Sequence, residues 1–191
     1  QLDAALKSYE KAIAIKPDYV DAHSNLGISL QELGQLDEAV KCFEQILAIN
    51  PNFEDAHYNL GNALYDLGQL DESVKSYEQA LAIKPDFADA HCNLGIALKE
   101  LDQLDAAVKN YEKAIAIKPD HVEAHNNLGN VLKDLGQLDA AVKCYKKALA
   151  IKPDYAEAHN NLGFILQELG QLDAAVRSYE KALAIKPDFA E

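Results

Sequence analysis

Histidines are the residues of this sequence best suited to binding a metal ion. Five of them recur every 34 residues, at His23, His57, His91, His125 and His159. On neighbouring packed helices that spacing would leave about 10 Å between successive rings, whereas ligands that share a zinc ion each lie ~2 Å from it. His121 and His125 lie four residues apart, which would allow an adventitious metal site only if residue 121 is helical. We therefore predict no functional metal site and no cofactor.

The cysteines and the common catalytic motifs favour no enzyme either. Cys42, Cys92 and Cys144 are odd in number, and no Cys-x-x-Cys pair is present. Cys42 and Cys144 lie three 34-residue periods apart, too far for a disulfide, so reduced thiols in a cytoplasmic protein are expected. The patterns Gly-x-x-x-x-Gly-Lys, Gly-x-Ser-x-Gly and His-Glu-x-x-His are absent. The sequence predicts a protein that is not an enzyme.

The charge balance excludes two classes of partner. The chain has 31 acidic and 18 basic residues, a net charge of −13. Nucleic acids and anionic membrane surfaces both require a basic footprint, so we predict neither as a partner. Apolar residues make up 49%, too many for a disordered acidic tail. The absence of methionine leads us to expect a fragment of a longer protein.

The prolines reveal the organisation that must position these side chains. Each follows the previous one by 34 residues, and the last two full units, 122–155 and 156–189, differ at only nine positions. A fixed period of this length predicts a repeat architecture. We divide the chain into units 20–53, 54–87, 88–121, 122–155 and 156–189, preceded by the second helix of a truncated unit at 1–19 and followed by the start of another at 190–191. The prolines are Pro17, Pro51, Pro85, Pro119, Pro153 and Pro187.

Each unit contains two short helical patterns. In unit 88–121, small and apolar residues recur at spacings of three and four over 90–101 and again over 107–117. Asp105 is predicted as the N-cap of the second helix. Pro119 should end it, because proline lacks the amide hydrogen and restricts the residue before it. Each unit therefore reads as a helix–turn–helix hairpin.

Glycines support the same scheme. Four mark the predicted turn between the helices, where a left-handed residue is needed, and Asp102 occupies that position in unit 88–121. Five more lie inside the first helix, and we expect them to permit close approach of the second helix at the small residues opposite, such as Ser73. The turn glycines are Gly34, Gly68, Gly136 and Gly170, and the helical ones are Gly27, Gly61, Gly95, Gly129 and Gly163.

A unit that reads A-H-x-N-L-G-x-x-L…A…Y/F…A…P resembles the tetratricopeptide repeat, or TPR. The residues that carry the resemblance in the second unit are Leu60, Gly61, Ser73, Tyr77, Ala80 and Pro85. The resemblance covers the whole chain and implies an all-α TPR solenoid, a right-handed superhelix of helix–turn–helix hairpins whose concave wall is lined by the first helix of each unit. The histidines are a systematic departure, because they stand where the family pattern has Trp.

One asparagine per unit forms what we call the asparagine row. A carboxamide offers an acceptor and two donors, which match the polar groups of a peptide backbone, so the row could hold an extended chain. It is similar to the asparagine ladder of O-linked N-acetylglucosamine transferases, and the A-H-x-N-L-G pattern is similar to that subfamily and to related bacterial TPR proteins. The alternative is that these side chains bond between neighbouring helices. The row consists of Asn25, Asn59, Asn93, Asn127 and Asn161.

Further candidate peptide-binding residues lie near the row on the same helices. Some vary between units, and others are always acidic. An acidic groove should favour extended peptides with basic residues, although an ordinary solvated helix face is an equal alternative. The variable candidates are Tyr58, Asn62, Tyr65, Asn126 and Asn130, and the acidic ones are Asp55, Asp89 and Glu123.

These features predict a protein-interaction scaffold that binds an extended peptide or protein segment in the concave groove. Two alternatives stay open. The array could assemble with itself, end to end through an uncapped final helix near 173–185, where Tyr179 and Leu183 would present an apolar face. It could instead be the substrate-recruiting arm of a larger enzyme such as a glycosyltransferase.

Overall fold

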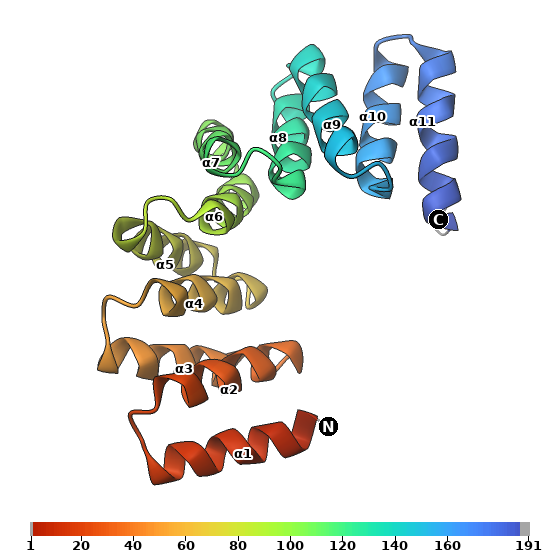
Figure 1. Cartoon of the computed structure of the whole chain (residues 1–191). Coiled ribbons are helices and arrows are strands. Elements are labelled where there is room, and N and C mark those ends of the chain that lie inside the picture. Colours follow the sequence, from red (N-terminus) through yellow and green to blue (C-terminus); the bar gives the residue numbers. More distant parts are fainter. Residues whose placement is uncertain (1, 188–191) are drawn as a thin grey trace. The chain divides into compact units, whose positions relative to one another are not determined.

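The computed structural model describes residues 2–187, and within that range every regular element is an α helix. The predicted start of a further unit at 190–191 lies outside the described residues. Helices alternate between a first and a second member of each hairpin (Figure 1). The first helices are α2 (Val20–Glu32), α4 (Glu54–Asp66), α6 (Ala88–Glu100), α8 (Val122–Asp134) and α10 (Ala156–Glu168). The second helices are α1 (Leu2–Ile15), α3 (Leu36–Ile49), α5 (Leu70–Ile83), α7 (Leu104–Ile117), α9 (Leu138–Ile151) and α11 (Leu172–Ile185).

The second helices end where the prolines predict. In the third unit, α7 ends at Ile117, and Lys118 is the C-cap with extended backbone angles. The backbone amide of Lys118 still donates to the carbonyl of Ala114 over 2.8 Å. Pro119 follows, and a proline has no amide hydrogen with which to continue that pattern.

The predicted N-cap of these helices was wrong. In the third unit, Gln103 is the N-cap, with φ −90° and ψ 61°, and its side chain makes no capping bond. The Gln103 carbonyl accepts the first helical bond, from the amide of Ala107 over 3.0 Å. Asp105 lies inside the first turn, where a carboxylate favours the helix through the positive end of its dipole instead of through a cap.

The turns between the two helices have the left-handed residue that the sequence predicts. Gly34, Gly68, Gly136 and Gly170 have φ between 72° and 75°. Asp102 has φ 58°, and it is the only residue other than glycine with positive φ within 2–187. An aspartate tolerates this region better than most residues, so the hairpin keeps its turn without glycine.

Close packing within a hairpin explains the glycines of the first helices. A β-carbon built on Gly61 would lie 2.6 Å from the Tyr77 ring. The predicted partner, Ser73, donates its hydroxyl to the Gly61 carbonyl over 2.8 Å. The expected close approach is therefore present, but the atoms that exclude a β-carbon belong to the aromatic ring instead of to the small residue.

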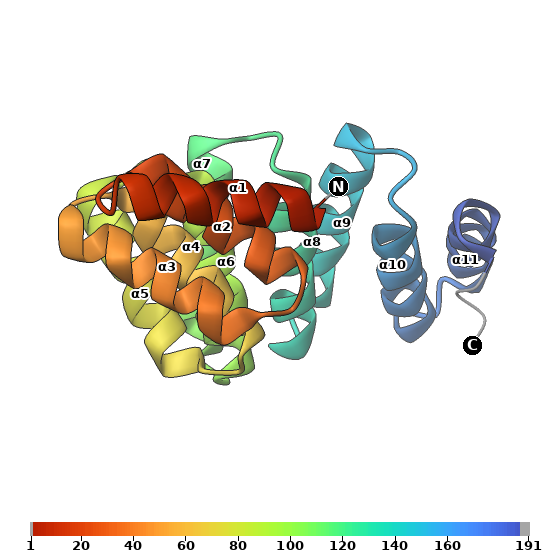
Figure 2. The same cartoon turned by 90° about the horizontal axis from the view of Figure 1, so that it is seen from below.

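Hairpins stack on one another within each of two units, Gln1–Leu101 and Asp102–Glu191. In the first unit α1 to α6 pack in sequence order, and in the second α8 to α11 lie side by side, as Figures 1 and 2 show for each unit taken separately. Within these units, α2, α4, α8 and α10 each pack against a second helix on either side, and α6 packs against α5. The buried stripe of each first helix forms the core, and its opposite stripe carries the asparagine row.

Candidate functional site

The asparagine row has one member on each first helix, from α2 to α10. Asn25 is exposed, and Asn59, Asn93, Asn127 and Asn161 are half-buried. Identical positions in the repeat do not give identical hydrogen bonding, however.

In the unit Gln1–Leu101, protein contacts fix the orientation of the Asn93 side chain. Its Nδ2 donates to the Tyr58 hydroxyl over 3.1 Å and to Asn62 Oδ1 over 2.9 Å. Both amide hydrogens of Asn93 are therefore used by the preceding repeat. Its Oδ1 accepts no bond from the residues that the structure describes, so the carboxamide presents an oriented acceptor.

The unit Asp102–Glu191 contains the same arrangement, made by different residues. Asn161 Nδ2 donates to Asn126 Oδ1 over 3.2 Å and to Asn130 Oδ1 over 3.1 Å. In both units the acceptors precede the asparagine by 35 and 31 residues. The alternative interpretation of the row, as a bond between neighbouring helices, thus holds for two of its five members.

The residue 31 positions before each asparagine decides which members are fixed. Asn62 and Asn130 stand there for Asn93 and Asn161, whereas Ile28 stands there for Asn59. An isoleucine side chain has no acceptor, and within the described residues Asn59 makes no side-chain hydrogen bond. The row therefore contains oriented members and members whose donors and acceptor both remain available.

A buried phenol in turn holds each of the two acceptor asparagines. The hydroxyl of Tyr77 donates to Asn62 Oδ1 over 2.8 Å, and that of Tyr145 donates to Asn130 Oδ1 over 2.8 Å. Burial of both rings raises the pKa of each phenol above its ordinary value. Each hydroxyl therefore keeps its proton at neutral pH and remains a donor.

A pocket of about 260 Å³ lies beside Asn93 in the unit Gln1–Leu101. Gln31 lines it, and its Nε2 donates to Asp66 Oδ2 over 2.6 Å. Tyr65 lines the pocket as well, and burial, followed by the charges of Glu100 and Asp66, raises the pKa of its phenol. The pocket therefore presents the protonated phenol of Tyr65 and the oriented carbonyl of Asn93 together.

Two predicted peptide contacts have a different position from the one expected. Asn126 is only 3% exposed, and its Oδ1 is used by Asn161, so it orients the row instead of facing a ligand. Tyr58 is half-buried, with its ring 4.8 Å from that of Phe87, centroid to centroid. Both side chains are drawn into the contact between repeats because they are the acceptors 35 residues before a row member.

The acidic candidates Asp55, Asp89 and Glu123 are exposed on the first turns of α4, α6 and α8. Carboxylates at this end of a helix are stabilised by its dipole. They give these helices a negative edge whether or not a ligand is bound.

The repeated histidines have a structural partner in every unit. In each case Nε2 lies 2.8–3.1 Å from the carbonyl oxygen of the proline six residues earlier. A carbonyl only accepts, so the imidazole donates, and it ties the end of one second helix to the next first helix. The pairs are His23–Pro17, His57–Pro51, His91–Pro85, His125–Pro119 and His159–Pro153.

The other candidate chemistry is not gathered into a site. Within residues 2–187 no three His, Cys, Asp or Glu side chains are grouped closely enough to hold a metal ion. The imidazole Nδ1 of His121 instead accepts from the amide of Ala124 over 3.4 Å as the N-cap of α8. Cys42, Cys92 and Cys144 are free thiols. None of the described helices combines the length and apolar character needed to span a bilayer.

Comparison with known families agrees with the hairpin geometry. Models described as "TPR repeat" match residues 1–34, 30–68, 61–102, 97–136 and 129–170, and one described as "Tetratricopeptide repeat" matches 156–189. The chain belongs to the tetratricopeptide repeat family. No curated protein sequence matches this TPR chain.

Several solved TPR structures share the fold. A crystal structure of MamA has 27% sequence identity and a TM-score of 0.78, over 86% of this chain and 96% of that one. MamA from Desulfovibrio magneticus RS-1 has 21% identity and a TM-score of 0.80, over 91% and 98%. YrrB, described as a TPR protein with an unusual peptide-binding site, has 23% identity and a TM-score of 0.75, over 97% and 95%. These neighbours show the all-α TPR solenoid.

Sequence reasoning missed the coupling between the two helices of a hairpin. The repeat 54–87 pairs Asn62 with Tyr77, whereas the repeat 20–53 pairs Ile28 with Phe43. Repeats 88–121 and 156–189 pair a tyrosine with an apolar residue, Ile96 with Tyr111 and Phe164 with Tyr179, so the tyrosine alone does not identify a fixed row member. The readable signal was the asparagine at positions 62 and 130, whose Oδ1 accepts from Asn93 and Asn161.

Proposed function

We propose that this TPR protein is an interaction scaffold that binds an extended peptide along the asparagine row. The oriented acceptor of Asn93 is the observation that carries the proposal. Because its two amide hydrogens are already bonded, its Oδ1 is positioned before any ligand arrives. A donor or acceptor fixed in advance loses little side-chain entropy on binding.

The spacing of the row within each of the two units suits an extended backbone. Adjacent packed helices lie about 8–10 Å apart, and an extended chain advances about 3.3 Å per residue. One row member would therefore meet about every third peptide residue. Asn93 and Asn161 would accept backbone N–H groups, whereas Asn59 can both donate and accept.

The charge of the first helices supports a basic ligand. Asp55, Asp89 and Glu123 are exposed near the row, and the whole chain carries a net charge of −13. Complementary charge speeds encounter and selects partners. Lys or Arg side chains of the peptide would lie beside these carboxylates.

A peptide selection tests the proposal. Random peptides displayed on phage would be selected on the protein, and the affinity of a selected peptide would be measured by fluorescence anisotropy. Changing Asn59, Asn93 and Asn127 together to Ala should weaken binding by roughly 10- to 1,000-fold, since each lost hydrogen bond costs about 0.5–1.5 kcal/mol. Asn110→Ala is the matched control, because Asn110 lies on α7 and bonds to the Ala106 carbonyl.

Two results would argue against the proposal. Unchanged affinity of the triple variant, with helicity retained, would mean that the row does not hold the peptide. Affinity that rises with salt would contradict the electrostatic part, because screening weakens attraction between opposite charges.

We also propose self-association through α11. Leu172, Val176 and Leu183 are 62%, 54% and 41% exposed, although the equivalent side chains of earlier repeats are partly buried. An apolar face of this kind favours association. Sedimentation should show mass that grows with concentration, and Val176→Lys should abolish the growth. A wild-type monomer at about millimolar concentration would refute it.

A further inference from the structure

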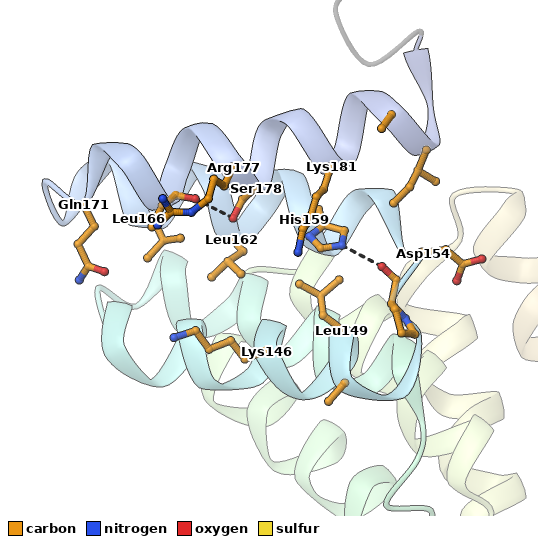
Figure 3. Close-up of a pocket in the computed structure, with 15 residues that line it drawn as sticks. Lys146, Leu149, Asp154, His159, Leu162, Leu166, Gln171, Arg177, Ser178 and Lys181 are labelled. Atoms are coloured by element: carbon orange, nitrogen blue, oxygen red, sulfur yellow. Dashed lines mark hydrogen bonds between the residues drawn. The ribbon is translucent and has the colours of Figure 1, made fainter.

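A second surface of the chain, unrelated to the asparagine row, forms an open groove of about 750 Å³. Helices α9 and α11 form its walls, and α10 forms its floor (Figure 3). The floor includes the apolar side chains of Leu162 and Leu166 and the bonded ring of His159. All three helices belong to the unit Asp102–Glu191.

The walls of the groove carry three cations. Lys146 lies on α9, and Arg177 and Lys181 lie on α11, one helical turn apart. None of the three forms an ion pair with a carboxylate among residues 2–187. Asp154, in the loop between α9 and α10, is the one acidic residue that lines the groove. A local excess of positive charge is unusual in a chain of net charge −13.

Lys146 is the residue that departs from the repeat. Its position holds glutamate in all the other units, at Glu10, Glu44, Glu78, Glu112 and Glu180. The equivalent groove between α1 and α3 has a volume of about 330 Å³ and is lined by Glu10, Lys41 and Gln45. That groove is balanced in charge, whereas the groove of α9–α11 is basic.

The basic groove and the asparagine row lie on opposite faces of α10. Residues advance by about 100° around a helix, so His159, Leu162 and Leu166 form one stripe. Asn161 and Phe164 point roughly the other way. Occupation of one surface therefore leaves the other accessible.

We propose that this groove binds an amphipathic helix with an apolar stripe and acidic flanks. The cations stand on both walls and at successive turns, so they match several carboxylates spread along a chain better than one anionic headgroup. The walls and floor are helices whose backbone groups are already bonded, so the groove offers no free backbone edge to an extended peptide. A helix satisfies its own backbone and presents side chains alone, the helix-in-groove mode of recognition.

A designed peptide of about 15 residues, close to the length of α11, provides the probe. It carries leucines at i, i+3, i+4 and i+7, with glutamates on both flanks, and a matched peptide carries lysines in place of the glutamates. Binding is measured by fluorescence anisotropy. We expect the acidic peptide to bind and the basic one not to bind.

Two variants borrow residues that other repeats of this chain already contain, so both should fold. Lys146→Glu restores the glutamate of the other units, and Ala174→Glu introduces the residue found at Glu38 and Glu72. Each should weaken binding of the acidic peptide about tenfold or more, the scale of an interfacial charge pair. Lys75→Glu, on α5 in the first unit, changes net charge equally and should have no effect.

Four outcomes would overturn the proposal. They are failure of the wild-type protein to bind the acidic peptide, equal binding by Lys146→Glu, equal loss in Lys75→Glu, and binding to phosphatidylserine vesicles that competes with the peptide. Changing Asn59, Asn93 and Asn127 to Ala should leave this binding intact. That control separates the groove from the proposed function of the asparagine row.

Discussion

Tyr77 and Asn62 are expected to be energetically coupled, so replacing both should destabilise the protein less than the two single replacements added together. Asn62→Ile removes the acceptor of the Tyr77 hydroxyl, which lies 2.8 Å away on a side chain that is 2% exposed. Leaving a buried hydroxyl without a partner costs about 1–3 kcal/mol. Tyr77→Phe alone should cost about 1 kcal/mol, because Asn62 Oδ1 keeps the donor of Asn93.

The double variant should cost less than the sum of the two single ones. It recreates the pair Ile28 and Phe43 of the repeat 20–53, where Phe43 is completely buried. The double variant has no tyrosine hydroxyl, so it avoids the cost of the unpaired hydroxyl that Asn62→Ile leaves behind. The loss of the acceptor for Asn93 is the same in Asn62→Ile and in the double variant. We therefore expect a coupling energy of about 1 kcal/mol, within the range for residues in contact.

Urea unfolding followed by circular dichroism measures this cycle. Repeat arrays unfold as coupled units, so whole curves of all four proteins should be fitted together. The same exchange at Asn130 and Tyr145 is an internal replicate, because its hydrogen bond also measures 2.8 Å. Additive destabilisation at both places would refute the coupling, and so would a double variant less stable than Asn62→Ile.

Three further changes test the packing and the turns. Burial raises the pKa of Tyr77 and Tyr145 above that of an unfolded tyrosine, so the stability they contribute should be intact below pH ~10 and lost as pH rises beyond it. In a variant that carries both Tyr77→Phe and Tyr145→Phe, the urea midpoint should therefore fall less steeply above pH ~10 than in the wild-type protein. Asp102→Gly should raise the unfolding free energy by up to about 1 kcal/mol by relieving the left-handed backbone, and Gly136→Asp should lower it, both by urea titration. Gly61→Ala should destabilise by about 1–3 kcal/mol, because ring overlap exceeds the gain in helix propensity. A more stable alanine variant in thermal unfolding would contradict this packing.

Backbone features were the most predictable part of the fold, because they depend on residues close together in the chain. Proline ends each second helix locally, and the turn requires one left-handed residue, which is why Asp102 could be assigned without coordinates. The N-cap prediction at Asp105 failed by two residues for the same local reason. Its carboxylate favours the first turn nearly as well as the cap, so sequence alone did not separate the two positions.

The candidate site was less predictable, because its side chains depend on partners about one repeat away. Asn59 and Asn93 have the same local sequence position, yet only Asn93 is oriented by the preceding helix. Asn126 was a candidate peptide contact, but it is buried and its Oδ1 accepts from Asn161. Arg177 was not among the candidate site residues, yet it lines the groove beside α9.

Small exchanges within a fixed scaffold are therefore what distinguish one repeat from the next. Asn62 in place of isoleucine orients a carboxamide on the next first helix, and Lys146 in place of glutamate changes the charge of the groove between α9 and α11. Neither change alters a helix boundary, because both side chains lie outside the buried stripe of small residues that fixes hairpin packing. A repeat protein can thus acquire two surfaces of different chemistry while its core stays uniform, and each surface can be altered by residues that another repeat of the same chain already carries.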